Sequence, residues 1–174
     1  MNINQSNDSN YRYKMDELII SYIGKSGKAN KGFTILTNIK TISEQLNHNY
    51  KTLLKYISLN LGCKNDDTKL CIQGHHDKNT IQNIIFNYIN TFILCKKCSI
   101  PELQYKNKKN IIFTHCLGCG DDTNINEITL SKNNKKIYNN ILSDINNNFF
   151  NTISNTTNIT NTIDTEFIST DDFF

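Results

Sequence analysis

Apolar residues first gather in two short runs near the start of the chain, separated by a polar loop. Residues 18–23 read LIISYI and residues 33–37 read FTILT, and both runs are rich in the β-branched and aromatic side chains that favour strands. The segment between them, GKSGKANKG, contains three glycines and three lysines. Because glycine and polar residues mark turns, we expect a β-hairpin with a mobile basic loop.

Three segments after the hairpin carry apolar residues at the i, i+3, i+4 spacing that places side chains on one face of a helix. The first begins at Thr37 or Asn38, either of which can cap a helix, and the second begins near Tyr50 and ends at Gly62. The third, residues 81–93, has the strongest pattern, and we interpret its apolar face as core. The inward-facing residues of the three segments are Ile39, Ile42, Leu46, Leu53, Leu54, Ile57, Leu61, Ile81, Ile84, Ile85, Tyr88, Ile89, Phe92 and Ile93.

The rest of the chain has weaker patterns. Residues 69–73, KLCIQ, predict a further strand that turns at Gly74, and short strands and knuckles follow Leu94. Residues 1–14 contain almost nothing that could bury apolar surface, and residues 131–161 include eleven asparagines. We expect both segments to be disordered, with a weak helix near 135–150 as the alternative for the second.

Four of the six cysteines form two C-x2-C pairs, CKKC and CLGC, separated by seventeen residues. Two such knuckles can close a tetrahedron of thiolates around one Zn²⁺ ion, which is a strong pattern for zinc. Four protein ligands leave no open position, so we expect a structural ion that does not activate water. An iron–sulfur cluster on the same ligands is the alternative. The predicted ligands are Cys95, Cys98, Cys116 and Cys119.

The remaining cysteines and histidines show no ligand pattern. We interpret Cys63 and Cys71 as structural thiols, and His75 and His76 as loop residues after Gly74. His115 precedes a predicted ligand, but four thiolates already complete the shell, so we interpret it as a surface residue.

These patterns predict an α+β fold in four parts. A flexible N-terminal tail (residues 1–16) precedes a small mixed α/β body (residues 17–94) built from hairpin strands and two to three helices. A four-cysteine zinc ribbon (residues 95–130) follows. An asparagine-rich, acidic tail (residues 131–174) comes last and is predicted to be disordered.

The net charge of +3 hides an uneven distribution. Residues 1–120 contain 16 Lys and Arg against 8 Asp and Glu, whereas residues 121–174 contain 3 against 8. A basic body points to a polyanionic partner such as nucleic acid or a phosphate-bearing complex, and a solvated lysine surface is the alternative.

No segment approaches the run of about 18 apolar residues that spans a membrane, and the first ten residues lack the features of a secretory signal. We therefore expect a cytoplasmic monomer without membrane contact, whose cysteines are reduced or metal-bound. The sequence contains no P-loop, nucleophile–base pair or paired-carboxylate motif, so we expect no enzymatic activity of its own.

Arg12 is the only arginine among the 19 basic residues, and it lies between Tyr11 and Tyr13. A guanidinium is planar, permanently charged and able to make two parallel hydrogen bonds to phosphate oxygens, whereas lysine is a more strongly hydrated point charge. We therefore expect Arg12 to have a specific role toward phosphate. The alternative is that it stacks on a neighbouring tyrosine or contacts RNA phosphate without a further role.

Taken in order, YRYKM, GKSGKANKG, LKYISLNLG, IQGHH, FILC and the two knuckles resemble the N-terminal domain of eukaryotic translation initiation factor 5 over residues 11–120. The beta subunit of initiation factor 2 has a similar body and ribbon. The resemblance implies a GTPase activator that acts on GTP-bound initiation factor 2, through its gamma subunit, during start-codon selection. Its partners would include the small ribosomal subunit and the initiator tRNA complex.

The resemblance places the family's key arginine on Arg12, which would be supplied in trans to the GTPase. It also implies contacts with partner or RNA from a set of aromatic and basic residues. Two alternatives remain: a beta-like binding module that activates nothing, and a zinc-ribbon RNA-binding protein unrelated to initiation. The residues predicted to contact partner or RNA are Tyr11, Tyr13, Lys14, Lys25, Lys28, Lys31 and Lys55.

Overall fold

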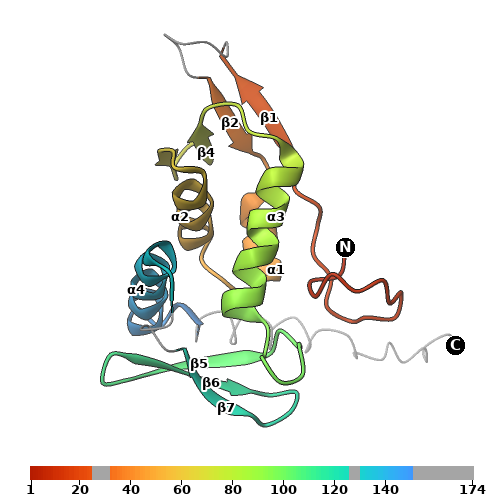
Figure 1. The fold of residues 1–174 in the computed structure, drawn as a ribbon, viewed down its shortest axis with the longest axis vertical. Helices are drawn as coiled ribbons and strands as arrows, with labels where there is room; N and C mark the ends of the chain where they lie inside the picture. Colours follow the sequence, from red (N-terminus) through yellow and green to blue (C-terminus); the bar gives the residue numbers. More distant parts are fainter. Residues whose placement is uncertain (25–31, 126–129, 151–174) are drawn as a thin grey trace, which may run out of the picture.

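The computed structural model describes residues 1–24, 32–125 and 130–150, which form a small mixed α/β structure (Figure 1). Within these residues there are four α-helices, one π-helical turn and two antiparallel sheets. The predicted mixed α/β class is confirmed. The first sheet lies at one end of the molecule and the second at the other, with the helices between them.

The first sheet has the strand order β1-β2-β4-β3, and the predicted hairpin, β1 and β2, forms one edge. Burial alternates along β2, where Leu36 is fully buried and Phe33 is exposed, so one face of the sheet packs on the helices. The predicted strand at 69–73 is shorter than expected because Leu70 has a φ of 53°, which interrupts the extended backbone. The strands are β1 (Ile20–Ile23), β2 (Phe33–Leu36), β3 (Asn65–Asp66) and β4 (Cys71–Gln73).

The first two predicted helices are present. Asn38 precedes the first, but its side-chain amide bonds to the Ile19 nitrogen (2.8 Å) and the Glu17 carbonyl (2.9 Å) instead of capping the helix. Asn49 caps the second helix, and Gly62 ends it in the left-handed conformation that was expected of it, with a φ of 65°. The helices are α1 (Ile39–Gln45) and α2 (Tyr50–Leu61).

The third predicted helix, α3 (Lys78–Tyr88), continues into a π-helical turn, η1 (Ile89–Ile93). Asp77 caps its start by accepting a hydrogen bond from the Thr80 nitrogen at 3.0 Å. Nearly all of the predicted apolar face is buried, while Ile84 is only partly buried. The turn η1 carries the chain directly into the first cysteine pair.

The second sheet, with strand order β5-β6-β7, lies below the helices in Figure 1. Strands β5 and β6 are joined by Lys109 and Asn110, both left-handed with φ values of 54° and 62°, as two-residue hairpin turns require. Its strands are β5 (Leu103–Lys108), β6 (Ile111–Cys116) and β7 (Asp122–Ile125).

The prediction of disorder after residue 131 is wrong for its first part, where the alternative, a helix near 135–150, is confirmed by helix α4 (Lys132–Asn146). Ser131 caps the helix, and Ile137, Tyr138 and Ile141 are buried in the main core. Asparagine has a weak helix propensity, but burial of this apolar face stabilises the helix by more than the propensity costs. Residues 151–174, the rest of the predicted tail, lie outside the described residues.

The flexible tail predicted for residues 1–16 is not confirmed. Ile3 and Met15 are buried, and backbone hydrogen bonds from Ile3 to Tyr13 (3.1 Å) and from Met15 to Met1 (2.9 Å) close the segment on itself. The Asn2 side chain also stabilises the loop, since its amide nitrogen donates to the carbonyls of residues 6 and 8. The segment is therefore a folded loop packed on the body.

One hydrophobic core joins these parts. It includes Ile3 from the N-terminal loop, Phe92 from η1, Ile112 from the second sheet and Tyr138 from α4. Among the described residues, no helix has the length and apolar character that a membrane span requires.

Candidate metal centre and adjacent cleft

The four cysteines predicted as ligands converge at one end of the second sheet. Their sulfur atoms all lie within 4.8 Å of one another, with 3.7 Å between Cys95 and Cys119 and 3.6 Å between Cys98 and Cys116. A disulfide would bring two sulfurs to about 2.05 Å, so these are separate thiols. Four sulfurs at about 2.3 Å from one zinc ion form a tetrahedron with edges of about 3.8 Å. The cluster could therefore hold a single metal ion.

Each cysteine pair is shaped by a tight turn. In the first, the Ser99 nitrogen donates to the Cys95 carbonyl at 2.9 Å. In the second, the Gly120 nitrogen donates to the Cys116 carbonyl at 2.8 Å. A hydrogen bond from the Leu117 nitrogen to the Glu102 carbonyl (2.9 Å) joins the second knuckle to the residue before β5. The spacing of the sulfurs therefore depends on backbone geometry at the end of η1 and the end of β6.

The thiols have unequal proton affinities. Burial raises the pKa of Cys95, but backbone N–H groups of Cys98 and Lys97 outweigh it and lower the pKa to about 7. Burial and the neighbouring thiols raise the pKa of Cys98 to about 12. A divalent cation among the sulfurs favours all four thiolates, so metal binding releases protons.

Two tyrosines of the N-terminal loop bond to the segment that connects the first knuckle to β5. The Tyr11 hydroxyl donates to the Ser99 carbonyl at 3.4 Å, and the Tyr13 hydroxyl donates to the Glu102 carboxylate. The second bond raises the pKa of Tyr13. The backbone on both sides of Arg12 is thus held against the metal-binding end of the molecule.

Arg12 itself is exposed, and its guanidinium carbon lies 5.7 Å from the centroid of the Tyr13 ring. Within residues 1–24, 32–125 and 130–150, its guanidinium makes no ion pair. A cation–π contact at an exposed site contributes only about 0.5–1 kcal/mol. The contact orients the side chain but leaves its hydrogen-bond donors available to a partner.

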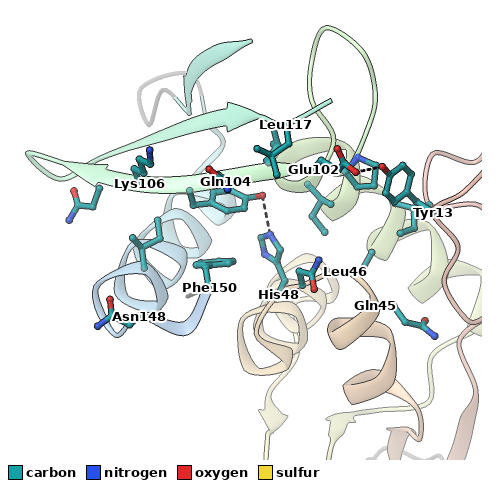
Figure 2. A pocket seen from close by; sticks show the side chains of 18 of the residues that line it. Tyr13, Gln45, Leu46, His48, Glu102, Gln104, Lys106, Leu117, Asn148 and Phe150 are labelled. Atoms are coloured by element: carbon teal, nitrogen blue, oxygen red, sulfur yellow. Dashed lines mark hydrogen bonds between the residues drawn. The ribbon is translucent and has the colours of Figure 1, made fainter. Parts of the chain in front are cut away.

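Arg12 and Tyr13 border a cleft of about 1070 Å³ between β5 and the loop that joins α1 to α2 (Figure 2). Figure 2 shows Tyr13 and Glu102 at one end of the cleft and Lys106 toward the other, with His48 and Phe150 between them. The cleft has apolar side chains from the N-terminal loop, α1, β5 and the end of α4. It lies where the body meets the second sheet.

A chain of buried hydrogen bonds crosses behind this cleft. Tyr105 donates to the Phe92 carbonyl, so its oxygen is left to accept from His48 Nε2 at 3.0 Å. His48 Nδ1 then accepts from the Tyr88 hydroxyl at 2.8 Å. Burial lowers the pKa of His48 to about 3 and raises the pKa of Tyr88 and Tyr105, so all three are neutral. No sequence pattern marked His48 or Tyr105.

Of the lysines predicted to contact a partner, the structure describes Lys14 and Lys55, and only Lys14 lies near Arg12. Lys14 is exposed beside it, and its ammonium donates to the Ser9 carbonyl at 3.2 Å. Lys55 is exposed on α2, which lies on the other side of α3 from the N-terminal loop (Figure 1). Lys25, Lys28 and Lys31 lie outside the described residues.

The histidines and extra cysteines lie apart from the four thiols. His75 is exposed and its ring lies 4.8 Å from that of Tyr22, in the turn where it was expected. His115 pairs with Asp122 at 2.8 Å on the surface of the second sheet. Burial raises the pKa of both Cys63 and Cys71, which favours unreactive thiols.

Comparison with known proteins places residues 3–122 in one family, described as the domain found in initiation factors 2B and 5. The chain is 35% identical over 125 residues to eukaryotic translation initiation factor 5 of Caenorhabditis elegans, covering 69% of this chain and 28% of that protein. It is 33% identical over 129 residues to the mouse (Mus musculus) protein of the same name, covering 69% and 29%. It is also 30% identical over 89 residues to translation initiation factor 2 subunit beta of Archaeoglobus fulgidus, covering 50% and 65%.

The chain therefore matches less than a third of the length of these factor 5 relatives. The matched part includes the N-terminal loop with Arg12, the body and both cysteine pairs.

Proposed function

Since the chain belongs to the translation initiation factor family that includes factor 5 and the beta subunit of factor 2, we propose that it is a GTPase activator. Its target is GTP-bound initiation factor 2, on its gamma subunit, during start-codon selection on the small ribosomal subunit. The chain is not itself an enzyme under this proposal. It supplies Arg12 to a nucleotide held by the partner.

The observation that carries the proposal is the way Arg12 is presented. The tyrosines on both sides bond to Ser99 and Glu102, in the segment between the first knuckle and β5, while the guanidinium is exposed at the border of a cleft. A side chain on a folded loop loses less conformational entropy on docking than one on a free tail. The partner therefore meets a positioned cation, which fits a role in catalysis better than diffuse charge attraction.

The chemistry of the guanidinium agrees with this role. It carries a permanent charge and a planar set of donors that matches two phosphate oxygens at once. An arginine supplied in trans can raise GTP hydrolysis by about 10³ to 10⁵, because it stabilises the charge that develops in the transition state.

We further propose that the four-cysteine site holds one structural Zn²⁺. The convergence of all four sulfurs within 4.8 Å supports a single ion over an iron–sulfur cluster, whose ligands bind different iron atoms and lie further apart. The ion would fix the knuckle that precedes the segment to which Tyr11 and Tyr13 bond, and so the position of Arg12.

The proposal is tested by single-turnover GTP hydrolysis in the initiation factor 2 ternary complex with small ribosomal subunits. Arg12→Ala and Arg12→Lys should each reduce the stimulated rate by at least about 10³, because neither supplies a planar bidentate donor. Binding to the complex should change little. Lys64→Ala is the matched control, because it changes an exposed lysine directly before β3. This variant should stimulate GTP hydrolysis at the wild-type rate. Full stimulation by either Arg12 variant would refute the catalytic role.

A beta-like binding module is the second candidate, favoured by the match that covers 65% of the archaeal beta subunit. Such a module would bind the gamma subunit or the ribosome without activating hydrolysis. Wild-type protein would then enter the complex with no change in rate, which the same assay detects. The family match removes the third hypothesis, a ribbon protein unrelated to initiation.

A further inference from the structure

The cleft beside Arg12 has an apolar floor and a basic border. Arg12, Lys106 and Lys108 line it and are exposed. The carboxylate of Glu102 also lines it but accepts the Tyr13 hydroxyl. The apolar lining that remains accessible comprises Leu103, Leu117, Ile145 and Phe150, whereas Ile3, Leu46 and Ile93 lie buried beneath it. Such a surface fits an occupant with negative charges and large apolar side chains.

The chain itself contains a segment with that composition. Residues 164–174 read DTEFISTDDFF and combine four acidic residues with three phenylalanines, and residues 151–174 contain no lysine or arginine. The described part of the chain also ends beside the cleft. Phe150, the last residue before it that the structure describes, lines the cleft, and its ring lies 4.8 Å from that of Tyr105.

We propose that residues 164–174 dock in the cleft of their own chain, with phenylalanine rings on the apolar floor and carboxylates beside Arg12, Lys106 and Lys108. The connection between Phe150 and Asp164 is long enough. Fourteen residues span at most about 46–50 Å, which is ample for a cleft whose lining already includes Phe150.

Tethering also favours this occupant over a separate molecule. A tether of this length gives an effective concentration on the order of 1 mM, so even a weak contact is substantially occupied. A second copy of the chain at micromolar concentration competes about a thousandfold less well. The docked segment would cover Arg12, and this consequence rests on the proposed function.

The docking is tested on the 174-residue protein with a carbodiimide, which forms an amide bond directly between a touching carboxylate and lysine. Equal amounts of light and heavy isotope-labelled chains are mixed first, and linked peptides are identified by mass spectrometry. We expect bonds within one chain from residues 164–172 to Lys106 and Lys108. Lys132 and Lys136 on α4 are exposed and nearer in sequence, and should be linked much less.

A triple variant, Phe167→Ala, Phe173→Ala and Phe174→Ala, keeps every carboxylate and removes the rings. It should reduce the bonds to Lys106 and Lys108 by about tenfold, since the rings provide the apolar contact. Equal linking to the α4 lysines, or links mainly between light and heavy chains, would overturn the proposal.

Stimulated GTP hydrolysis provides a second, independent measurement of docking. Neutralising the acids (Asp164→Asn, Glu166→Gln, Asp171→Asn and Asp172→Asn) should increase stimulated GTP hydrolysis if the docked segment covers Arg12. Because cross-linking is measured without the GTPase, expected links with no stimulation by any variant would refute the proposed function and leave docking established. Stimulated hydrolysis without the expected links would support the proposed function and refute docking.

Discussion

His48 shows how one side chain can connect two parts of the molecule. It lies in the loop between α1 and α2, receives a hydrogen bond from Tyr88 of α3 and donates one to Tyr105 of β5. Its neighbours hold it neutral, because burial lowers its pKa to about 3. A protonated imidazole has no acceptor nitrogen for the Tyr88 hydroxyl, so the arrangement depends on neutrality.

This residue should make stability fall in mild acid. The unfolded chain binds a proton at His48 below pH about 6.5, whereas the folded chain does not until about pH 3, so the free energy of unfolding decreases as pH falls between these values. The slope from this one group is about 1.4 kcal/mol per pH unit. Urea denaturation at pH 7, 6 and 5 measures it.

His48→Gln removes the titrating group while retaining one donor and one acceptor. The free energy of unfolding of the variant should depend less steeply on pH, by the uptake of about one proton. Other titrating groups, including the four thiols, affect both proteins alike, so the difference between the two slopes reports His48. Identical slopes in wild type and variant would show that His48 is not the source.

Helix α4 and the N-terminal loop show where sequence patterns stop being informative. The hairpin, α2 and α3 were predicted because apolar periodicity is local and strong. By contrast, the hydrogen bond from Tyr13 to Glu102 joins residues 89 positions apart, which no local pattern encodes. Low apolar content made the N-terminal loop look disordered, and asparagine-rich composition left α4 only as an alternative, since the stability of both comes from burial against other elements and not from intrinsic propensity.

The same division holds for the candidate site. The four cysteines were identified from spacing alone, because metal chemistry restricts ligand type and separation. Arg12 was singled out as an isolated arginine, but its anchoring was not foreseen. The cleft and the His48 hydrogen bonds required the structure, since each brings together residues from segments that are far apart in the sequence.

The Tyr138 hydroxyl makes a buried connection between helix α4 and the second sheet, besides the exposed bond from Asn107 to Asn146. The Tyr138 hydroxyl accepts from the buried Ile112 nitrogen at 2.9 Å and donates to the Asn110 carbonyl at 3.3 Å. Tyr138→Phe should reduce the free energy of unfolding by about 1–3 kcal/mol, because it leaves a buried N–H without a partner. Tyr22→Phe removes a hydroxyl bonded to the His76 carbonyl at an exposed site and should cost much less. Equal losses in urea denaturation would contradict this role for α4.

The body and the second sheet are stabilised together. Ile112 of β6 and Phe92 of η1 belong to one core, and the first knuckle begins where η1 ends. Loss of structure around the thiols should therefore spread beyond the second sheet. Basic residues on that sheet and on the N-terminal loop also lie at the same end of the molecule, which is consistent with a polyanionic partner there.

Metal removal tests this connection. The protein should contain one zinc ion per chain, and a strong chelator should lower the melting temperature of the entire chain in a single transition. Cys98→Ser should lose the ion, whereas Cys63→Ser, outside the cluster, should retain it. Elemental analysis and thermal denaturation followed by circular dichroism measure both. An unchanged melt after complete zinc removal would contradict the expected coupling.

The π-helical turn at residues 89–93 gives the chain a strict requirement on length. The Leu94 nitrogen closes this turn on the Ile89 carbonyl at 3.0 Å, and Leu94 is the single residue between the turn and Cys95. An extended residue advances the chain by about 3.3 Å, so deleting Leu94 would move Cys95 away from the other three sulfurs. The number of residues between Tyr88 and Cys95 thus determines where the first thiol lies. Because Tyr11 and Tyr13 bond to residues that follow this thiol, the same number also determines the direction in which Arg12 faces.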